Sequence, residues 1–249
     1  MELNAENMWV SKYWHPAVAV DAVVFGFNPE RKQLAVLLIE RGKDPLEPYK
    51  GAWALPGGFI TQNDQSAKDA MLRELKEETD VEGVEPIEFH TFSDAGRDPR
   101  ERVISIAFYA LVNVNDYLKI KGGSDAQNAQ WFMIDELPEL AFDHKKIIDT
   151  ALARLQRSIY FEPVGFRLLD KEFTMPQLQS IYLAILRPAK GEEGGLGDRR
   201  NFAKKMLSLG YIVPTGKVVA DSRNRPPLLY TFDEEAYKNA KHKGMKLEF

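Results

Sequence analysis

A run of closely spaced carboxylates follows a glycine turn and constrains this chain more than any other feature. The segment RELKEE, residues 73–78, lies downstream of the turn LPGGF, residues 55–59. Glu74, Glu77 and Glu78 are spaced i, i+3 and i+4, which places them on one face of a helix. Three like charges repel, and a divalent cation with oxygen ligands would remove that repulsion. The alternative is an ordinary solvated acidic face.

The surrounding sequence predicts that these carboxylates lie on a packed helix. Ser66 followed by Asp69 is a capping-box signal, and apolar residues then recur at the helical spacing. We expect the helix to run to about Thr79, with Gly57 and Gly58 allowing an unhindered loop before it. A packed helix whose carboxylates lie beside a glycine loop has the parts of a metal–phosphate site.

The stretch resembles the Nudix box, whose pattern is Gly, five residues, Glu, seven residues, then Arg-Glu-apolar-any-Glu-Glu-any-Gly-apolar. The residues that match are Gly58, Arg73, Glu74, Leu75, Glu77, Glu78 and Val81. The resemblance implies that Glu74, Glu77 and Glu78 bind catalytic Mg²⁺, with Mn²⁺ as the alternative ion. It also places Arg73 in the catalytic set.

Two departures from the pattern affect its scaffold and leave the metal ligands intact. One extra residue separates Gly58 from Arg73, and Asp64 or Gln65 takes the place of the first Glu. In the family that Glu pairs with the Arg and shapes the loop; Asp64 can reach Arg73 if the extra residue bulges. Asp80 stands where the pattern has Gly, at a helix end that usually has positive φ, and Asp tolerates that conformation less well than Gly.

Composition excludes several kinds of chemistry. The 249 residues, 44% of them hydrophobic, suffice for one large domain or two smaller ones. Without cysteine there is no disulfide, no thiolate zinc site and no cysteine nucleophile. Because the N-terminus lacks a signal-peptide pattern and no apolar run approaches membrane-spanning length, we expect a cytoplasmic protein with no membrane partner.

The order of predicted elements indicates an α/β/α sandwich with a mixed sheet over residues 1–159. Strands are expected at residues 17–27, 33–40, 52–55, 85–93, 103–112 and 130–134. The first two should form a hairpin around residues 28–32. Helices are expected at residues 66–79 and 144–158, with Asp143 as the N-cap of the second.

Residues 160–249 have the plan of a winged helix. Thr174 should cap a helix that runs to about Leu186, and Asp198 a second from Arg199 to Leu209, after a flexible loop at 188–197. A short strand at 211–213 and a hairpin at 217–219 and 228–232 follow. The candidate DNA-binding residues are Arg199, Arg200, Asn201, Lys204, Lys205, Arg223 and Arg225.

Charge distribution agrees with two domains that have different partners. Residues 161–249 hold 15 Lys or Arg and 11 Asp or Glu, a net charge of +4, whereas the rest of the chain has −8. A basic helix can enter a DNA major groove, and a basic wing can reach phosphates. The alternatives are chance fluctuation, a solvated appendage or a dimerisation module.

The resemblance covers nearly the whole chain. Residues 52–59 are similar to the loop entry of Nudix ADP-ribose pyrophosphatases, and residues 96–100 and 140–144 resemble motifs shared with Nudix-related transcriptional regulators. Residues 198–205 and 225–230 resemble the recognition helix and wing of those regulators.

The same resemblance indicates which residues bind a substrate. Arg97 and Arg100 suit a diphosphate or ribose-bearing ligand because their guanidinium groups are fork-shaped cations. Gly57 and Gly58 complete the expected substrate-binding set. The alternative for Arg97 is an ion pair with Asp94 or Asp98 within its own loop.

Three functions are consistent with the sequence. The first is a Mg²⁺-dependent Nudix hydrolase that cleaves the pyrophosphate of ADP-ribose or a related nucleoside diphosphate derivative, with Asp125 as the nearest additional acidic residue. The second is a winged-helix transcriptional regulator that senses ADP-ribose or a sugar-related ligand and binds operator DNA as a homodimer. The third is a nucleotide-binding protein whose second domain only mediates assembly.

Overall fold

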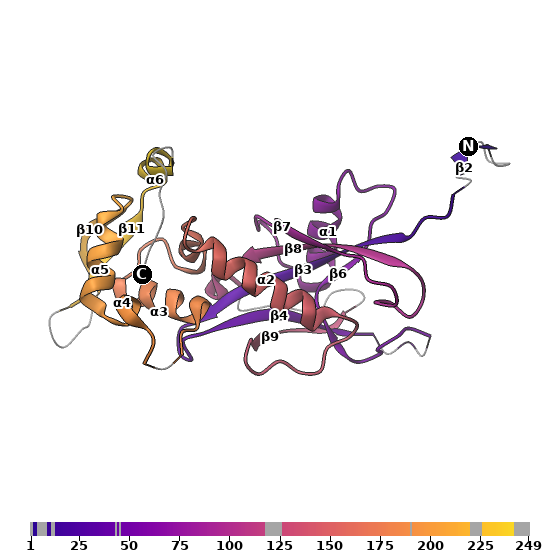
Figure 1. The fold of residues 1–249 in the computed structure, drawn as a ribbon, viewed down its shortest axis with the longest axis horizontal. Coiled ribbons are helices and arrows are strands. Elements are labelled where there is room, and N and C mark those ends of the chain that lie inside the picture. The colour runs from indigo at the N-terminus through magenta and orange to yellow at the C-terminus, as the bar shows by residue number, and fades with distance from the viewer. Residues whose placement is uncertain are drawn as a thin grey trace.

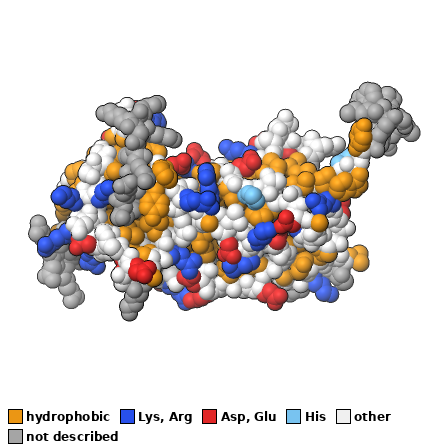
Figure 2. Space-filling model, in the orientation of Figure 1, with side chains coloured by type: hydrophobic (Ala, Val, Ile, Leu, Met, Phe, Trp, Pro, Cys, Tyr) orange, Lys and Arg blue, Asp and Glu red, His pale blue; other side chains and the backbone are white. Residues whose placement is uncertain are grey.

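The structure, a computed structural model, describes residues 2–3, 9–10, 13–42, 44, 46–117, 126–189, 191–219 and 226–241. Within these ranges the chain forms an elongated molecule, with a sheet-based domain at one end and a helical domain carrying a β-hairpin at the other (Figure 1). No helix in these ranges is long and apolar enough to cross a membrane. On the face in Figure 2, acidic and basic side chains are interspersed over the sheet-based domain.

Strand β3 (Ala17–Asn28) lies at the centre of the main sheet because its apolar residues are buried on both faces. It pairs antiparallel with β4 (Gln33–Arg41) and parallel with β8 (Val103–Leu111). The other strands of this sheet are β5 (Trp53–Ala54), β6 (Gly57–Phe59), β7 (Ile87–Phe92) and β9 (Ala126–Met133). β5 and β9 pair with β4, β6 with β3, and β7 with β8. The predicted hairpin and mixed sheet are confirmed.

Two helices cover opposite faces of this sheet. Val24 of β3 belongs to the apolar core under α1 (Ala67–Thr79), whereas its neighbour Val23 belongs to the core under α2 (His144–Ser158). This division arises because successive side chains of a strand point to opposite faces. The predicted α/β/α sandwich is therefore confirmed, and both helices have the predicted bounds within one residue.

The second domain has the connectivity of a winged helix. Its elements are η2 (Val164–Leu168), α3 (Met175–Leu186), α4 (Gly194–Gly197), α5 (Arg199–Ser208), β10 (Ile212–Val218), β11 (Leu228–Phe232) and α6 (Glu234–Lys241). The Thr174 hydroxyl accepts a hydrogen bond from the Gln177 N–H, completing a capping box. The Asp198 carboxylate accepts from the N–H groups of Arg200 and Asn201. Both predicted helix caps are confirmed.

Several segments differ from the sequence expectation because pairing with distant residues overrides the local pattern. β6, expected as a loop, pairs with β3, and β9 begins before residue 130 because it follows most of β4. β10 is one strand with an irregular register, and part of the expected loop at 188–197 forms α4. The sequence does not predict β1 (Glu2–Leu3), β2 (Trp9–Val10), η1 (Val114–Tyr117), η2 or α6.

One continuous apolar core joins the two domains. It contains Leu155 and Ile159 at the end of α2 together with Ile181 and Ile185 of α3, and all four side chains are 0% exposed. The Gln156 side-chain amide donates to the carbonyl oxygen of Ile185 at 2.9 Å. The C-terminal end of α2 is thus fixed directly to the first helix of the winged helix.

Ion pairs at the surface cross the same junction. Arg167 Nη2 lies 3.0 Å from Glu85 Oε2, and Arg187 pairs with Asp135. Exposed pairs of this kind contribute little each, so the apolar core is the main link between the domains.

Replacing Ile185 with Ala should lower the free energy of unfolding of the whole chain by about 2–5 kcal/mol, because it removes buried carbons from the shared core. All 4 tryptophans precede the second domain, so their fluorescence reports on the first domain alone. Circular dichroism reports on the helices of both. In urea, the Ile185→Ala variant should shift both unfolding midpoints together.

The control for this experiment is Leu207→Ala, because the side chain of Leu207 on α5 is 39% exposed and its loss should change stability little. A loss of helical signal in Ile185→Ala at an unchanged fluorescence midpoint would show that the domains unfold independently.

Candidate functional site

Helix α1 presents the carboxylates of the Nudix-like stretch. It begins after Ser66, whose hydroxyl accepts a hydrogen bond from the Asp69 N–H, and it ends at Asp80, which has a φ of 60°. Both the N-terminal cap and the left-handed C-terminal residue are as predicted. Ala70, Met71 and other apolar residues bury the opposite face of the helix, which leaves the carboxylate face toward the glycine loop.

The guanidinium of Arg73 ties this helix to the loop before it. Its Nε and Nη2 donate to the two oxygens of Asp64 at 2.9 and 3.0 Å, and Nη2 also donates to the Phe59 carbonyl at 3.2 Å. Its Nη1 donates to Glu74 at 2.8 Å and to Glu77 at 3.3 Å. Asp64 therefore takes the place of the missing Glu, as predicted for a bulged loop. The hydrogen bonds from Arg73 hold the pKa of Asp64 well below its usual range.

The glycine loop lies against the carboxylates. The Gly57 N–H donates to Glu78 Oε2 at 2.8 Å. A side chain at Gly58 would come within 2.4 Å of Glu74 Oε1, and one at Gly57 would come within 2.2 Å of the Val20 carbonyl oxygen. Gly57 needs to be glycine because a Cβ there would overlap backbone atoms, whereas a Cβ at Gly58 would displace the carboxylate of Glu74.

The donors of this helix suit a hard divalent cation in chemistry but not in their present arrangement. Carboxylate oxygens are what Mg²⁺ prefers, yet those of Glu74 and Glu77 contact Arg73, and Glu78 contacts the loop N–H. Within the described ranges, no three His, Asp or Glu side chains are grouped to hold a metal ion. Burial raises the pKa of Glu74, and Arg73 opposes that shift. The assignment of these three residues as metal ligands stays a prediction.

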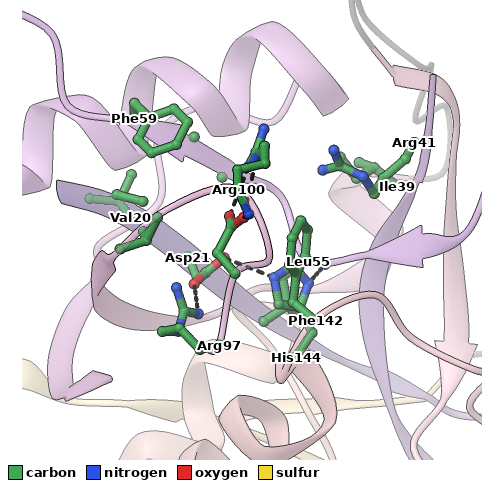
Figure 3. A pocket seen from close by; sticks show the side chains of 15 residues that line it. Val20, Asp21, Ile39, Arg41, Leu55, Phe59, Arg97, Arg100, Phe142 and His144 are labelled. Carbon is green, nitrogen blue, oxygen red and sulfur yellow. Dashed lines mark hydrogen bonds and ion pairs between the residues drawn. The ribbon is translucent and has the colours of Figure 1, made fainter. Parts of the chain in front are cut away.

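A pocket opens on the other side of the glycine loop (Figure 3). It brings together four residues predicted to bind a substrate, Gly57, Gly58, Arg97 and Arg100. The enclosed part has a volume of about 60 Å³, which is room for a few water molecules. Only part of a nucleotide would fit inside, and the rest would lie over the open rim.

Arg97 is held at the base of this pocket by carboxylates from other elements. Its side chain is 6% exposed; Nη2 lies 2.7 Å from Asp143 Oδ1 and 3.4 Å from Asp21 Oδ2. Burial lowers the pKa of Arg97, but the two carboxylates outweigh that effect and raise it. The alternative of a partner in its own loop is wrong: Asp94 pairs with Lys146, and Asp98 with Arg100.

Arg100 and a further cation, Arg41, lie beside aromatic rings at the rim. Arg100 pairs with Asp98 at 2.9 Å, and its guanidinium lies 5.4 Å from the ring centre of Phe59. Arg41 lies 5.0 Å from the ring of Phe142, within the range of a cation–π contact. Burial lowers the pKa of Arg41, and nearby Arg100 adds to that effect although Glu47 opposes it.

Phe142 has a backbone conformation that non-glycine residues seldom adopt. Its φ is 53°, and such strain persists only where the surroundings fix it, often at binding sites. The rings of Tyr49 and Phe142 are 4.7 Å apart. The rim of the pocket therefore offers both aromatic faces and guanidinium groups to a ligand.

His144, the first residue of α2, is buried beneath the pocket. Its Nδ1 accepts a hydrogen bond from the Leu55 N–H at 2.8 Å, which assigns the proton of the neutral ring to Nε2, 3.4 Å from Asp21 Oδ1. Burial lowers the pKa of His144. Asp143 occupies the predicted N-cap position, but its carboxylate makes no capping hydrogen bond and binds Arg97 instead.

Five of the seven candidate DNA-binding residues lie on α5. Arg199, Arg200, Asn201 and Lys204 are exposed and Lys205 is half-buried. The buried face of α5 packs on α3, with the rings of Phe202 and Tyr182 5.5 Å apart. Arg223 and Arg225, as well as the additional acidic candidate Asp125, lie outside the described residues.

Sequence reasoning did not assign Asp21, Arg41 or Phe142 to the site. Asp21 had a usable signal, because it is a lone carboxylate in the apolar strand AVAVDAVVF, and a buried charge requires a partner. Phe142 lies in a motif that the resemblance had already singled out. Arg41 ends a strand and has no local signal that separates it from a surface residue.

Profiles of known protein families match both domains of the chain. A profile of the NUDIX domain matches residues 15–151, more than half of the chain. The chain belongs to the Nudix family. A profile of the NrtR DNA-binding winged helix domain matches residues 165–232 of this Nudix protein. Both parts of the predicted architecture are thereby confirmed.

Two relatives of this Nudix protein carry different descriptions. It is 29% identical over 230 residues to the ADPR responsive transcriptional repressor NtrR of Acinetobacter baylyi, covering 91% of this chain and 86% of the relative. It is 41% identical over 136 residues to the ADP-ribose pyrophosphatase of Methanocaldococcus jannaschii, covering 55% and 73%. The solved structure of Shewanella oneidensis NrtR complexed with a 27mer DNA matches with a TM-score of 0.72 at 28% identity, covering 92% and 97%.

The buried His144 predicts a pH dependence of stability. In the unfolded chain this His takes up a proton as the pH falls through about 6.5, whereas burial keeps it neutral in the folded protein. The unfolded state then binds more protons, so stability is lost below about pH 6.5, by at most about 1.4 kcal/mol per pH unit. His144→Asn keeps an acceptor for Leu55 and removes the titration. Urea unfolding of this variant should therefore depend less on pH between about 7.5 and about 5.5.

His90→Asn is the matched control, because His90 is exposed on β7 and its replacement should leave the pH dependence of the wild type unchanged. Parallel pH curves for His144→Asn and the wild type would contradict the neutral state of His144.

Proposed function

We propose that this Nudix protein is a transcriptional regulator that binds operator DNA through its winged helix and ADP-ribose, or a related nucleoside diphosphate derivative, at its Nudix pocket. The observation that carries the proposal is the winged-helix connectivity of the second domain, whose α5 exposes Arg200, Asn201 and Lys204. Similarity to the Acinetobacter baylyi repressor over most of both chains supports it.

The pocket suits the charged centre of such a ligand. Arg97, Arg100 and Arg41 present guanidinium groups, which bind phosphate oxygens in pairs. Gly57 and Gly58 line the same pocket, so their backbone lies beside these guanidinium groups. Because the enclosed volume is small, the nucleoside would lie at the rim, where Phe59 is 38% exposed and offers a ring face for stacking.

A homodimer would give the regulator a defined footprint on DNA. Two copies of α5 related by a two-fold axis would enter successive major grooves, about 34 Å apart. Arg200 and Asn201 would contact base edges, while Lys204 and Lys205 would contact phosphates. Binding of ligand and of DNA would be linked, each changing the affinity for the other by the same factor.

Removing two cations from α5 tests the DNA-binding role. The Arg200→Ala, Lys204→Ala double variant should bind a duplex from upstream of its own reading frame much more weakly. The slope of log affinity against log salt should fall in magnitude by about 1.8, since the homodimer loses the Lys204 phosphate contact of both protomers. Saturating ADP-ribose should change the affinity of the wild type for DNA by at least about fivefold. Fluorescence anisotropy measures all three quantities.

The control is a Lys68→Ala, Lys145→Ala double variant, which removes two exposed charges from α1 and α2. An equal affinity of the wild type and the α5 variant for the duplex would contradict the regulator.

A second function, hydrolysis, is favoured by the retained carboxylates of Glu74, Glu77 and Glu78 beside the glycine loop and by the identity to an ADP-ribose pyrophosphatase. These three residues would hold Mg²⁺ or Mn²⁺ once Arg73 releases Glu74 and Glu77. A bound ion of this kind neutralises a diphosphate and lowers the pKa of a coordinated water. The arginines would orient the substrate.

Incubation with ADP-ribose and Mg²⁺ tests hydrolysis by the appearance of AMP on chromatography. Glu77→Gln should lower the rate by at least about a hundredfold if Glu77 is a metal ligand, because one charged donor is lost. Glu82→Gln, which alters an exposed residue paired with Lys76, should not change the rate. No AMP at high protein concentration would exclude hydrolysis and leave the regulator intact.

A further inference from the structure

A cleft separates the sheet-based domain from the start of the recognition helix. Its walls come from the turn between β3 and β4, from α3, and from the junction of α4 with α5, and its volume is about 520 Å³. Figure 1 shows the β3–β4 turn beside α3 at the boundary of the two domains. The cleft is distinct from the Nudix pocket and shares no residue with it.

The charged residues that line this cleft are all cations. Lys32 comes from the β3–β4 turn and Arg199 from the first turn of α5, and Asp and Glu do not occur among the described lining residues. Both side chains are exposed. Within the described part of the chain, neither takes part in an ion pair. The cleft therefore carries two positive charges, one from each domain.

Neighbouring carboxylates are already engaged or face elsewhere. Asp198, next to Arg199, accepts hydrogen bonds from two N–H groups of α5. In the β3–β4 turn, Arg31 pairs with Glu136 at 2.6 Å. Glu30 is exposed and does not line the cleft. An anion that entered the cleft would meet the cations of Lys32 and Arg199 without displacing an acidic partner.

We propose that Lys32 and Arg199 hold a phosphate of the DNA backbone, so that the Nudix domain itself contacts DNA beside the recognition helix. The inference rests on the proposed regulator, because Arg199 begins the helix expected in the major groove. A DNA phosphate is the occupant that the position favours: the same α5 exposes Arg200 and Lys204 along the path of the duplex. A contact of this kind carries no sequence information and fixes the register of the protein on the duplex.

The contact would make DNA binding sensitive to how the two domains are placed. Lys32 and Arg199 belong to different domains, so both reach one phosphate only while the cleft keeps its width. A ligand that shifts the sheet-based domain relative to α5 would change this contact without altering the recognition helix. The cleft is thus a place where ligand state and DNA affinity can be linked.

Lys32→Ala in the full-length protein tests the proposal. Affinity is measured by fluorescence anisotropy at several salt concentrations, on the duplex from upstream of its own reading frame and on a scrambled duplex of equal length. The variant should bind both duplexes several-fold more weakly, and the slope of log affinity against log salt should fall in magnitude by about 1.8, because the homodimer loses one phosphate contact from each protomer. Lys32→Glu should weaken binding further, and Lys32→Arg should restore it.

Lys68→Ala is the matched control, since it removes one exposed lysine from the sheet-based domain on α1 and should keep the slope of the wild type. Thermal unfolding by circular dichroism checks that each variant is folded; Lys32 is exposed in a turn, so its replacement should not alter the melting temperature. A second measurement, the Lys32→Ala, Arg199→Ala double-mutant cycle, should show non-additive losses because both cations act on one phosphate.

An unchanged salt slope in Lys32→Ala, with the Arg200→Ala, Lys204→Ala variant still defective, would overturn the contact and leave the regulator standing. Additive losses in the double-mutant cycle would also overturn the shared phosphate. Failure of the wild type to bind either duplex would overturn the regulator and this contact together.

Discussion

The guanidinium of Arg73 connects the loop of the Nudix box to its helix and contacts the carboxylates of that helix. It is bonded to Asp64 and the Phe59 carbonyl on the loop, and to Glu74 and Glu77 on the helix. Loop and helix are held as one unit by this residue, and the pocket takes its shape from the loop. Because the same contacts occupy two of the three carboxylates, any divalent cation has to compete with Arg73 for its ligands. In the proposed hydrolase, the scaffold of the loop and the metal site would therefore use the same oxygens.

The pocket is a balanced set of charges rather than an open basic patch. Arg97 is paired with Asp143 and Asp21, and Arg100 with Asp98. In the proposed complex, a ligand phosphate would contact a guanidinium only by replacing or joining the carboxylate that already pairs with it, so the binding free energy would be a small difference between large terms. The arrangement would favour ligands with adjacent phosphates, which can engage more than one guanidinium, over singly charged ones.

The parts of the fold that local signals specify were predictable, and those that depend on distant partners were not. The capped helices and the β3–β4 hairpin follow from caps, turns and periodicity within a few residues. The sequence of β6 predicts a glycine loop, because the segment becomes a strand only by pairing with β3. The candidate site shows the same division between local signals and distant partners. Gly57, Gly58, Arg97 and Arg100 lie in local motifs and were assigned by resemblance. The partner of Arg97, Asp143, is 46 residues away and could not be read from its own loop.

The shared apolar core at the end of α2 bears on how this architecture can be dissected or recombined. Cutting the chain near residue 160 would expose the buried faces of both α2 and α3, including Leu155 and Ile185. Exposed apolar patches of this kind promote aggregation. A chimera that joins this winged helix to another domain must therefore carry the end of α2 with it. The suitable point for exchanging domains lies within the sheet-based domain, before the end of α2, rather than near residue 160.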